Sequence, residues 1–141
     1  MRVMGKVGFA VAAGALAVGS VFGAGTANAA GQHAAIAVSN STLYYGVSAD
    51  LASFDEAKKG ALDNCGEADC KILASWANGC GALVASDDGY AAESGPNRAA
   101  AERAAYELIS RITPTAVLAN TGSAQLSGAR IVEVVCTGNA R

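Results

Sequence analysis

Four cysteines are the residues of this sequence best suited to covalent chemistry: Cys65, Cys70, Cys80 and Cys136. An even number of cysteines in an exported domain is typical of two disulfide bonds. Zinc is the alternative, but the C-x4-C spacing of Cys65 and Cys70 is wider than the usual C-x2-C knuckle, and the chain has a single histidine, His33. We therefore predict disulfides, with no metal site and no cofactor.

Residues that could form a catalytic site are few. A Ser-His-Asp or Cys-His site would need His33, which we expect to lie solvated on a mobile amino-terminal end. Oxidised cysteines offer no thiolate nucleophile. Asp87 and Asp88 have the chemistry of half a carboxylate pair or of calcium ligands, but adjacent acids before a glycine are more typical of a hairpin turn. We predict no catalytic residue.

Four aromatic side chains are the candidates for a binding surface: Tyr44, Tyr45, Tyr90 and Trp76. Tyr and Trp suit interfaces because they combine a large contact area with a polar group. Tyr44 and Tyr45 should point to opposite faces of a strand, which would leave one of them outside. The alternative is ordinary packing, above all for Trp76. The interpretation we carry forward is a patch that binds a protein or a glycan.

The amino-terminal sequence predicts an export signal at residues 1–29. A short basic stretch precedes an apolar run from Val7 to Phe22, and Ala27-Asn28-Ala29 supplies the small residues that a signal peptidase reads. A transmembrane anchor is the alternative, but this run is shorter than the roughly 20 apolar residues that span a bilayer. We expect cleavage to leave residues 30–141 as one secreted domain, extracellular or in the cell envelope and without membrane insertion.

The charge balance argues against nucleic acid and anionic lipid as partners. The chain has a net charge of −2, and cleavage would remove Arg2 and Lys6 but no acid, so the mature domain is more acidic. Binding to phosphates is driven by Lys and Arg, and no basic run is present. A group of acids near the first cysteines is expected to form a solvated loop rather than a weak calcium site: Asp63, Glu67 and Asp69.

The mature chain contains an internal repeat. Ala35–Ser39 resembles Ala82–Ser86, and Lys71–Leu73 resembles Arg130–Val132. Each unit reads as two strands, a helix and a strand. The fold class is therefore predicted to be α+β, with two ββαβ-like repeat units forming one small disulfide-stabilised domain. The expected elements are, in order, strands at 34–39 and 43–48, a helix capped by Ser53, strands at 70–76, 81–86 and 89–93, a helix from Asn97 to Pro114, and a strand at 129–136.

Hydrophobic periodicity predicts which faces of the two helices are buried. The stripe of the first helix comprises Phe54, Ala57, Ala61, Leu62 and Cys65. The stripe of the second comprises Ala101, Ala104, Ala105, Leu108, Ile109 and Ile112. Residues 113–128 are an insertion in unit two. We expect it to be mostly loop, with a short strand at Val117 and Leu118 as an alternative.

The repeat also suggests how the cysteines pair, which four cysteines alone leave open in three ways. Cys65 ends a helix and Cys70 begins the next strand, so these two could close a local link. Cys80 and Cys136 end equivalent strands, and equivalent points near a pseudo-twofold axis can meet. We therefore predict the disulfides Cys65–Cys70 and Cys80–Cys136.

Several motifs of the mature chain resemble a known family. They are an Ala-Ile-Ala-Val strand followed by Tyr-Gly, a helix of the form S-x-x-E-A-x-x-x-A-L-x-x-C, then C-K-I-L and the segment Asn78–Leu83. Together they are similar to the exported actinobacterial proteins grouped as domain of unknown function (DUF) 4189, over residues 34–136. The resemblance implies a small secreted domain of repeated α+β units with disulfides and no established catalytic residues. This chain departs from the family at Ile109 and Ala129, where a repeat-matched cysteine pair would stand.

These observations favour a non-enzymatic interaction module that acts at the cell envelope or on an extracellular or host partner. A small envelope hydrolase, or an inhibitor of one, is the alternative, and a purely structural envelope protein is a third. An enzyme should show convergent polar residues in a pocket. A binding module should show an exposed aromatic patch without them.

Overall fold

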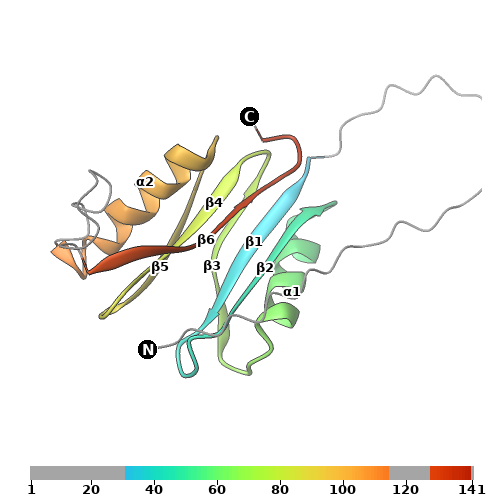
Figure 1. Ribbon diagram of the computed structural model, residues 1–141. Coiled ribbons are helices and arrows are strands. Elements are labelled where there is room, and N and C mark those ends of the chain that lie inside the picture. Colours follow the sequence, from blue (N-terminus) through green and yellow to red (C-terminus); the bar gives the residue numbers. More distant parts are fainter. Residues whose placement is uncertain (1–30, 115–127, 141) are drawn as a thin grey trace, which may run out of the picture.

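The computed structural model describes residues 31–114 and 128–140 (Figure 1). Within them the two predicted ββαβ units are confirmed. Unit one comprises β1 (His33–Ser39), β2 (Tyr45–Leu51), α1 (Phe54–Cys65) and β3 (Cys70–Ala77). Unit two comprises β4 (Cys80–Ser86), β5 (Gly89–Gly95), α2 (Arg98–Ile109) and β6 (Ala129–Cys136). The predicted export signal and the alternative strand at Val117 and Leu118 lie outside the described residues.

The units form two antiparallel sheets that pack face to face, with one helix on each outer side (Figure 1). The first sheet has the strand order β2-β1-β3 and the second has the order β5-β4-β6. Three hydrophobic clusters fill the spaces between the resulting four layers. The central cluster joins side chains of both sheets, including Ile36 of β1 and Leu83 of β4, which are both fully buried.

The strand registers confirm the internal repeat in detail. Ile36 of β1 pairs with Ala74 of β3, and the next pair skips one residue of β3. Leu83 of β4 pairs with Glu133 of β6, and the next pair again skips one residue. The bulge therefore stands at the same place in both units, as expected for duplicated segments. Across the sandwich β1 contacts β4, β2 contacts β6 and β3 contacts β5, which is the pattern of a pseudo-twofold axis between the units.

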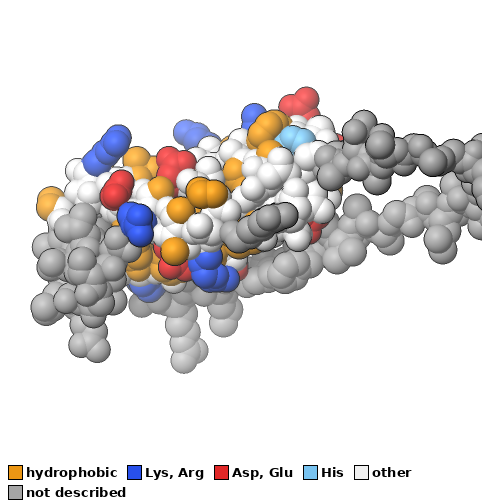
Figure 2. Space-filling model, turned by 90° about the horizontal axis from the view of Figure 1, so that it is seen from above, with side chains coloured by type: hydrophobic (Ala, Val, Ile, Leu, Met, Phe, Trp, Pro, Cys, Tyr) orange, Lys and Arg blue, Asp and Glu red, His pale blue; other side chains and the backbone are white. Residues whose placement is uncertain are grey.

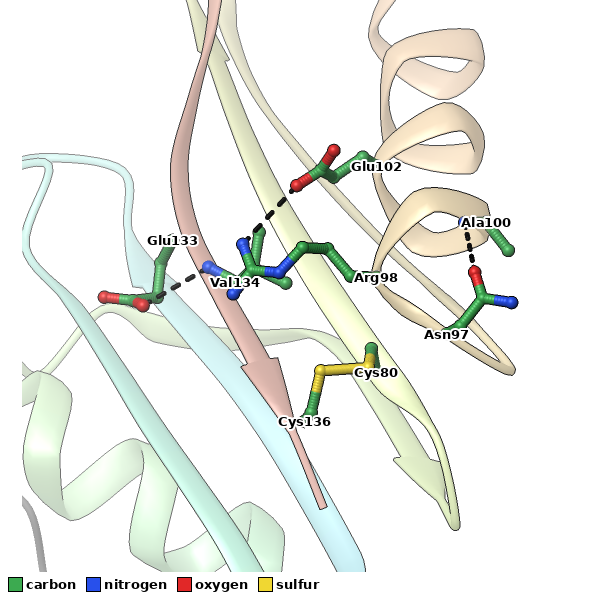
Figure 3. Close-up of polar contacts among 8 residues, drawn as sticks. All are labelled: Cys80, Asn97, Arg98, Ala100, Glu102, Glu133, Val134 and Cys136. Atoms are coloured by element: carbon green, nitrogen blue, oxygen red, sulfur yellow. Dashed lines mark hydrogen bonds and ion pairs between the residues drawn. A yellow bond between two sulfur atoms is a disulfide. The ribbon is translucent and has the colours of Figure 1, made fainter. Parts of the chain in front are cut away.

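Both helices begin at the predicted caps. Ser53 accepts a hydrogen bond from the backbone N–H of Glu56 at 3.2 Å, and Asn97 accepts one from Ala100 at 2.9 Å (Figure 3). These contacts satisfy backbone donors that the first helical turn would otherwise leave without a partner.

The buried stripes of the helices are narrower than predicted. Ala57 and Ala61 of α1 are fully buried, whereas Phe54 and Leu62 are 41% and 36% exposed. Small side chains face the sheet because the helix lies so close to it that larger ones are displaced to its margins. In unit two, α2 ends at Ile109, so the prediction that Ile112 continues its buried stripe is wrong: that side chain is 51% exposed.

Two further boundaries differ from the prediction. Strand β2 begins at Tyr45 rather than at residue 43, because Leu43 has a positive φ of 63° that interrupts the extended backbone. The helix α2 does not reach Pro114, because Arg111 and Ile112 donate their backbone N–H groups to carbonyls three residues earlier, which tightens the chain into turns.

Both predicted disulfides are present, but the reason given for the longer one is wrong. Cys80 begins β4 and Cys136 ends β6, and these two positions are direct partners on neighbouring strands of one sheet (Figure 3). The bond therefore links two strands of unit two rather than crossing the pseudo-twofold axis. The shorter bond joins Cys65 at the end of α1 to Cys70 at the start of β3, as expected.

The carboxyl-terminal tail closes the end of the sandwich opposite to the two hairpins. Asn139 donates its backbone N–H to the Gln32 side chain at 2.7 Å, and Gly138 donates to Asp50 at 2.6 Å. Trp76 donates its indole N–H to the Gly79 carbonyl, beneath this network. No helix among the described residues is long and apolar enough to cross a membrane.

A candidate binding groove at the hairpin end

A groove of about 780 Å³ opens at the end of the sandwich where both hairpins turn. One wall is formed by Asn40 and Leu43 of the β1–β2 turn and by Leu73 of β3. The other is formed by the β4–β5 hairpin from Ala85 to Tyr90 and by Arg130 of β6. The groove thus takes side chains from both repeat units, and its size is in the range of ligand-binding pockets.

Three side chains of the second sheet form a row along the groove. Ala85 of β4 pairs with Tyr90 on one side and with Arg130 on the other. Directly paired residues of adjacent strands point to the same face of a sheet. Ala85 is small and nearly fully buried, so the middle of the row is a depression between the Tyr90 phenol and the Arg130 guanidinium.

The β4–β5 hairpin is anchored to the segment that follows α2. Thr113 Oγ1 lies 2.8 Å from Ser86 Oγ and 2.9 Å from Asp88 Oδ2. Ser86 Oγ also accepts the backbone N–H of Asp88 at 3.2 Å. These bonds hold the Asp88 carboxylate, whereas Asp87 extends as an exposed acid at the rim. As predicted, the two acids form a hairpin turn before Gly89.

The β1–β2 turn has an equivalent anchor. Asp69 Oδ1 accepts the Ser39 hydroxyl at 2.6 Å, and its other oxygen accepts the backbone N–H of Ser41 at 2.9 Å. The hydrogen bond from Ser39 and then that from Ser41 hold the pKa of Asp69 below its ordinary value. Asp69 therefore fixes the turn that carries Asn40 and Leu43 into the groove.

The four aromatic residues proposed for binding do not form one surface. Tyr90 lines the groove, and Tyr44 is half-buried outside the groove lining. Tyr45 and Trp76 are 8% and 5% exposed, so they belong to the core rather than to a contact surface. The Trp76 ring covers Gly81, where a Cβ atom would lie 2.3 Å from it. Binding by Tyr44 and Tyr90 stays a prediction.

Tyr45 makes a polar contact between the sheets. Its hydroxyl donates to Glu133 Oε2 at 3.3 Å. Burial of the phenol, reinforced by the negative charge of Glu133, raises the pKa of Tyr45 above its ordinary value. Figure 3 shows Glu133 on the side of β6 that faces away from α2.

His33 is not on a mobile end, contrary to the sequence prediction. It begins β1, its Nδ1 lies 3.3 Å from the Leu51 carbonyl, and its ring packs edge-on against Phe54 at 4.4 Å between centroids. Figure 2 shows this end of the molecule, with the histidine at the surface beside hydrophobic side chains and with charges of both signs interspersed. The strand β1 separates His33 from the groove by roughly 20 Å, given about 3.3 Å per residue.

The family assignment follows from a match over the core of this structure. The family described as domain of unknown function DUF4189 matches residues 33–121, from the first residue of β1 through both helices. This chain belongs to the DUF4189 family. The predicted resemblance is thereby confirmed.

Curated relatives of this DUF4189 chain are mycobacterial. Protein Rv1269c of Mycobacterium tuberculosis and Protein Mb1300c of Mycobacterium bovis are each 41% identical to it over 75 residues. These matches cover 53% of this chain and 59% of each relative, so the chain spans about three fifths of the length of these relatives. No solved structure matches the DUF4189 chain.

Most of the groove of this DUF4189 chain has no signal in its sequence. Leu43, Leu73 and Arg130 become neighbours only because two sheets meet at their hairpin ends, so no motif joins them. Across residues 31–114 and 128–140 no three His, Cys, Asp or Glu side chains converge in a metal-binding arrangement. The groove combines a phenol, a guanidinium, two carboxylates and apolar walls, which is chemistry suited to recognition.

Proposed function

We propose that this protein is an exported, non-enzymatic binding module and that the groove at the hairpin end is its contact surface. The observation that carries this proposal is the lining of the groove. Leu43, Leu73 and Tyr90 supply apolar area, while Asp87 and Arg130 supply charges of opposite sign at its edges. The groove thus combines polar and apolar surface, and convergent polar groups beside apolar contacts are a feature of binding sites.

The geometry gives less support to a hydrolase. Nucleophilic catalysis needs a nucleophile and a base within hydrogen-bonding reach. The groove contains the Ser86 hydroxyl, but this group is engaged by Thr113 and by the backbone of Asp88. His33, the base that such a site would use, lies at the other end of β1. The arrangement therefore supports binding rather than bond cleavage.

Export is the second part of the proposal. The apolar run and small-residue site within residues 1–29 support cleavage by a signal peptidase. Two disulfides in so small a domain are typical of an oxidising compartment. Together these features favour a mature domain that works outside the cytoplasm, at the cell envelope or on an extracellular or host partner.

A capture experiment tests the groove as the contact surface. Oxidised protein from an exporting host would be immobilised and exposed to mycobacterial envelope extract, because the relatives are mycobacterial. We expect Tyr90→Ala to lose the captured partner and Lys71→Ala, a change at an exposed residue outside the groove lining, to retain it. If Tyr90→Ala and Leu73→Ser both retain every partner of the wild type, the groove is not the contact surface.

A further inference from the structure

We propose that the groove binds a carboxylate carried by an extended peptide, and that Tyr90 and Arg130 receive it from either side of Ala85. This inference rests on the proposed function and specifies its ligand. The molecule is pseudo-symmetric, and one half of its sheet interface contains a tyrosine–carboxylate contact that the other half lacks.

The half that contains this contact shows which group the interface accepts. Tyr45 of β2 and Glu133 of β6 lie on opposite sheets, and the Tyr45 hydroxyl donates to the Glu133 carboxylate at 3.3 Å. Tyr45 is 8% exposed and Glu133 is half-buried, so this contact is partly shielded from water. A carboxylate is a stronger acceptor for a buried hydroxyl than a neutral group is.

The other half repeats this geometry without the acid. Tyr90 is the repeat equivalent of Tyr45, because Tyr45 pairs with Val38 and Tyr90 pairs with Ala85 at matching positions of β1 and β4. Ala74 is the equivalent of Glu133, because these two pair with Ile36 and Leu83 beside the same bulge.

Because Ala74 stands at the position equivalent to Glu133, Tyr90 has no carboxylate partner like the one that Tyr45 has. Within the described part of the chain no group accepts a hydrogen bond from the Tyr90 hydroxyl, and Tyr90 lines the groove instead. A ligand carboxylate in the groove would give Tyr90 the kind of acceptor that Glu133 gives Tyr45.

Arg130 provides the charge that an external carboxylate needs. Its side chain is exposed, it lines the groove, and the two ion pairs of the described residues, Lys59–Asp63 and Arg98–Glu102, do not include it. A guanidinium forms bidentate, charge-assisted hydrogen bonds with a carboxylate. In the row from Tyr90 through Ala85 to Arg130, a hydroxyl and a guanidinium therefore flank the depression at Ala85, where the carboxylate would bind.

The remaining walls favour a peptide with a single acid over a polyanion. Asp87 and Asp88 are both exposed, both line the groove and both repel chains with repeated negative charge, such as acidic glycans. Leu43 and Leu73 offer apolar contacts to alternate side chains of an extended segment. Strand β3 is also an edge of its sheet, so its outer side can pair with a peptide backbone.

The probes are a matched pair of peptides, acetyl-Ala-Val-Glu-Ala-Ala-amide and its Gln counterpart. Titration of isotope-labelled, oxidised protein followed by NMR should shift the amide signals of Tyr90 and Arg130 with the Glu peptide. We expect the Gln peptide to bind at least about tenfold more weakly, since it forms no charge-assisted bond. Equal affinities, or no shift with either peptide up to about 1 mM, would overturn the proposal.

Two substitutions locate the site. Arg130→Gln should weaken the Glu peptide roughly tenfold, whereas Lys71→Gln should leave it unchanged, because Lys71 is the repeat equivalent of Arg130 outside the groove. Ala74→Glu should supply an internal carboxylate to Tyr90 and weaken the peptide by a similar factor. Arg130 is exposed and its loss should not affect folding, so retained affinity in Arg130→Gln contradicts the proposal even if Ala74→Glu fails to fold.

The outcomes separate this inference from the proposed function. A partner that requires Tyr90 but neither requires Arg130 nor is displaced by the Glu peptide would leave the binding module standing and refute the carboxylate ligand. Glucuronate oligosaccharide serves as the probe of the other class. If this oligosaccharide alone shifts the amide signals of the groove residues, the ligand is a glycan and the peptide proposal is wrong.

Discussion

Gly46 of β2 allows α1 to approach the first sheet closely. A Cβ atom at this position would lie 2.2 Å from both the Ala61 carbonyl oxygen and the Cys65 nitrogen, which are backbone atoms that no rotamer change can move. The facing helix surface is built from the fully buried Ala57 and Ala61. The small side chains of Ala57 and Ala61, together with Gly46, therefore set the distance between α1 and the first sheet.

Gly46→Ala should destabilise the protein, because the helix must shift away from the sheet to accommodate one methyl group. Overpacking of this kind costs about 3 kcal/mol. Urea unfolding followed by circular dichroism would measure the loss. Gly31→Ala is the matched control, because its Cβ atom would meet only side-chain atoms, at 3.5 Å or more. Equal midpoints for the two variants would contradict the proposed close approach.

At the scale of elements, each hairpin is fixed by a serine at the end of the central strand of its sheet. Ser39 ends β1 and binds Asp69, and Ser86 ends β4 and contacts Thr113. The partner comes from the segment after the helix in both units, although the residue type differs. Each ββαβ unit is thus closed at its hairpin end by a polar contact that also positions one wall of the groove.

The Asp69 anchor should make the first hairpin sensitive to acid. The pKa of Asp69 in the folded protein is below its ordinary value near 3.8, so the unfolded chain binds a proton more readily. The stabilisation is therefore fully present above about pH 4 and is lost as the pH falls through the lower, folded pKa. Urea midpoints of the wild type and Asp69→Asn should converge as the pH is lowered through this range. A difference between the wild type and Asp69→Asn that stays constant with pH would rule out the anchor.

The elements could be predicted from sequence because their signals are local. The caps Ser53 and Asn97 and the turn at Gly89 act within a few residues, so helix and strand positions follow from them. The groove could not be predicted, because Leu73 and Arg130 are brought together only by the packing of two sheets. The exposure of Ile112 was also missed, since periodicity does not reveal where a helix ends.

At the scale of the whole molecule, three thin hydrophobic clusters share one short chain. The clusters beneath the helices are built largely from alanine, with Ile109 as a large buried side chain of unit two. Ile109 and Ala129 stand where unit one has Cys65 and Cys70, so an apolar contact replaces a disulfide there. Small side chains bury little apolar area each, which raises the importance of covalent links for stability.

The two disulfides should therefore contribute unequally. In the chain-entropy model, the Cys80–Cys136 bond, with a sequence separation of 56, contributes about 4 kcal/mol, and the Cys65–Cys70 bond, with a separation of 5, contributes about 2 kcal/mol. Guanidinium unfolding of the double variants Cys80→Ser/Cys136→Ser and Cys65→Ser/Cys70→Ser would measure each loss.

We expect the former variant to be the less stable one, and reductant to lower the midpoint of the wild type toward that of a chain lacking both bonds. The Cys80–Cys136 bond lies at the end of β4 and β6 that is far from Ala85 and Arg130, so its loss should leave the affinity for the Glu peptide unchanged. Loss of the Cys65–Cys70 bond should instead weaken binding of the Glu peptide, since Cys70 follows Asp69, which anchors the β1–β2 turn at the groove. A midpoint that does not change with reductant would show that packing alone holds the sandwich together.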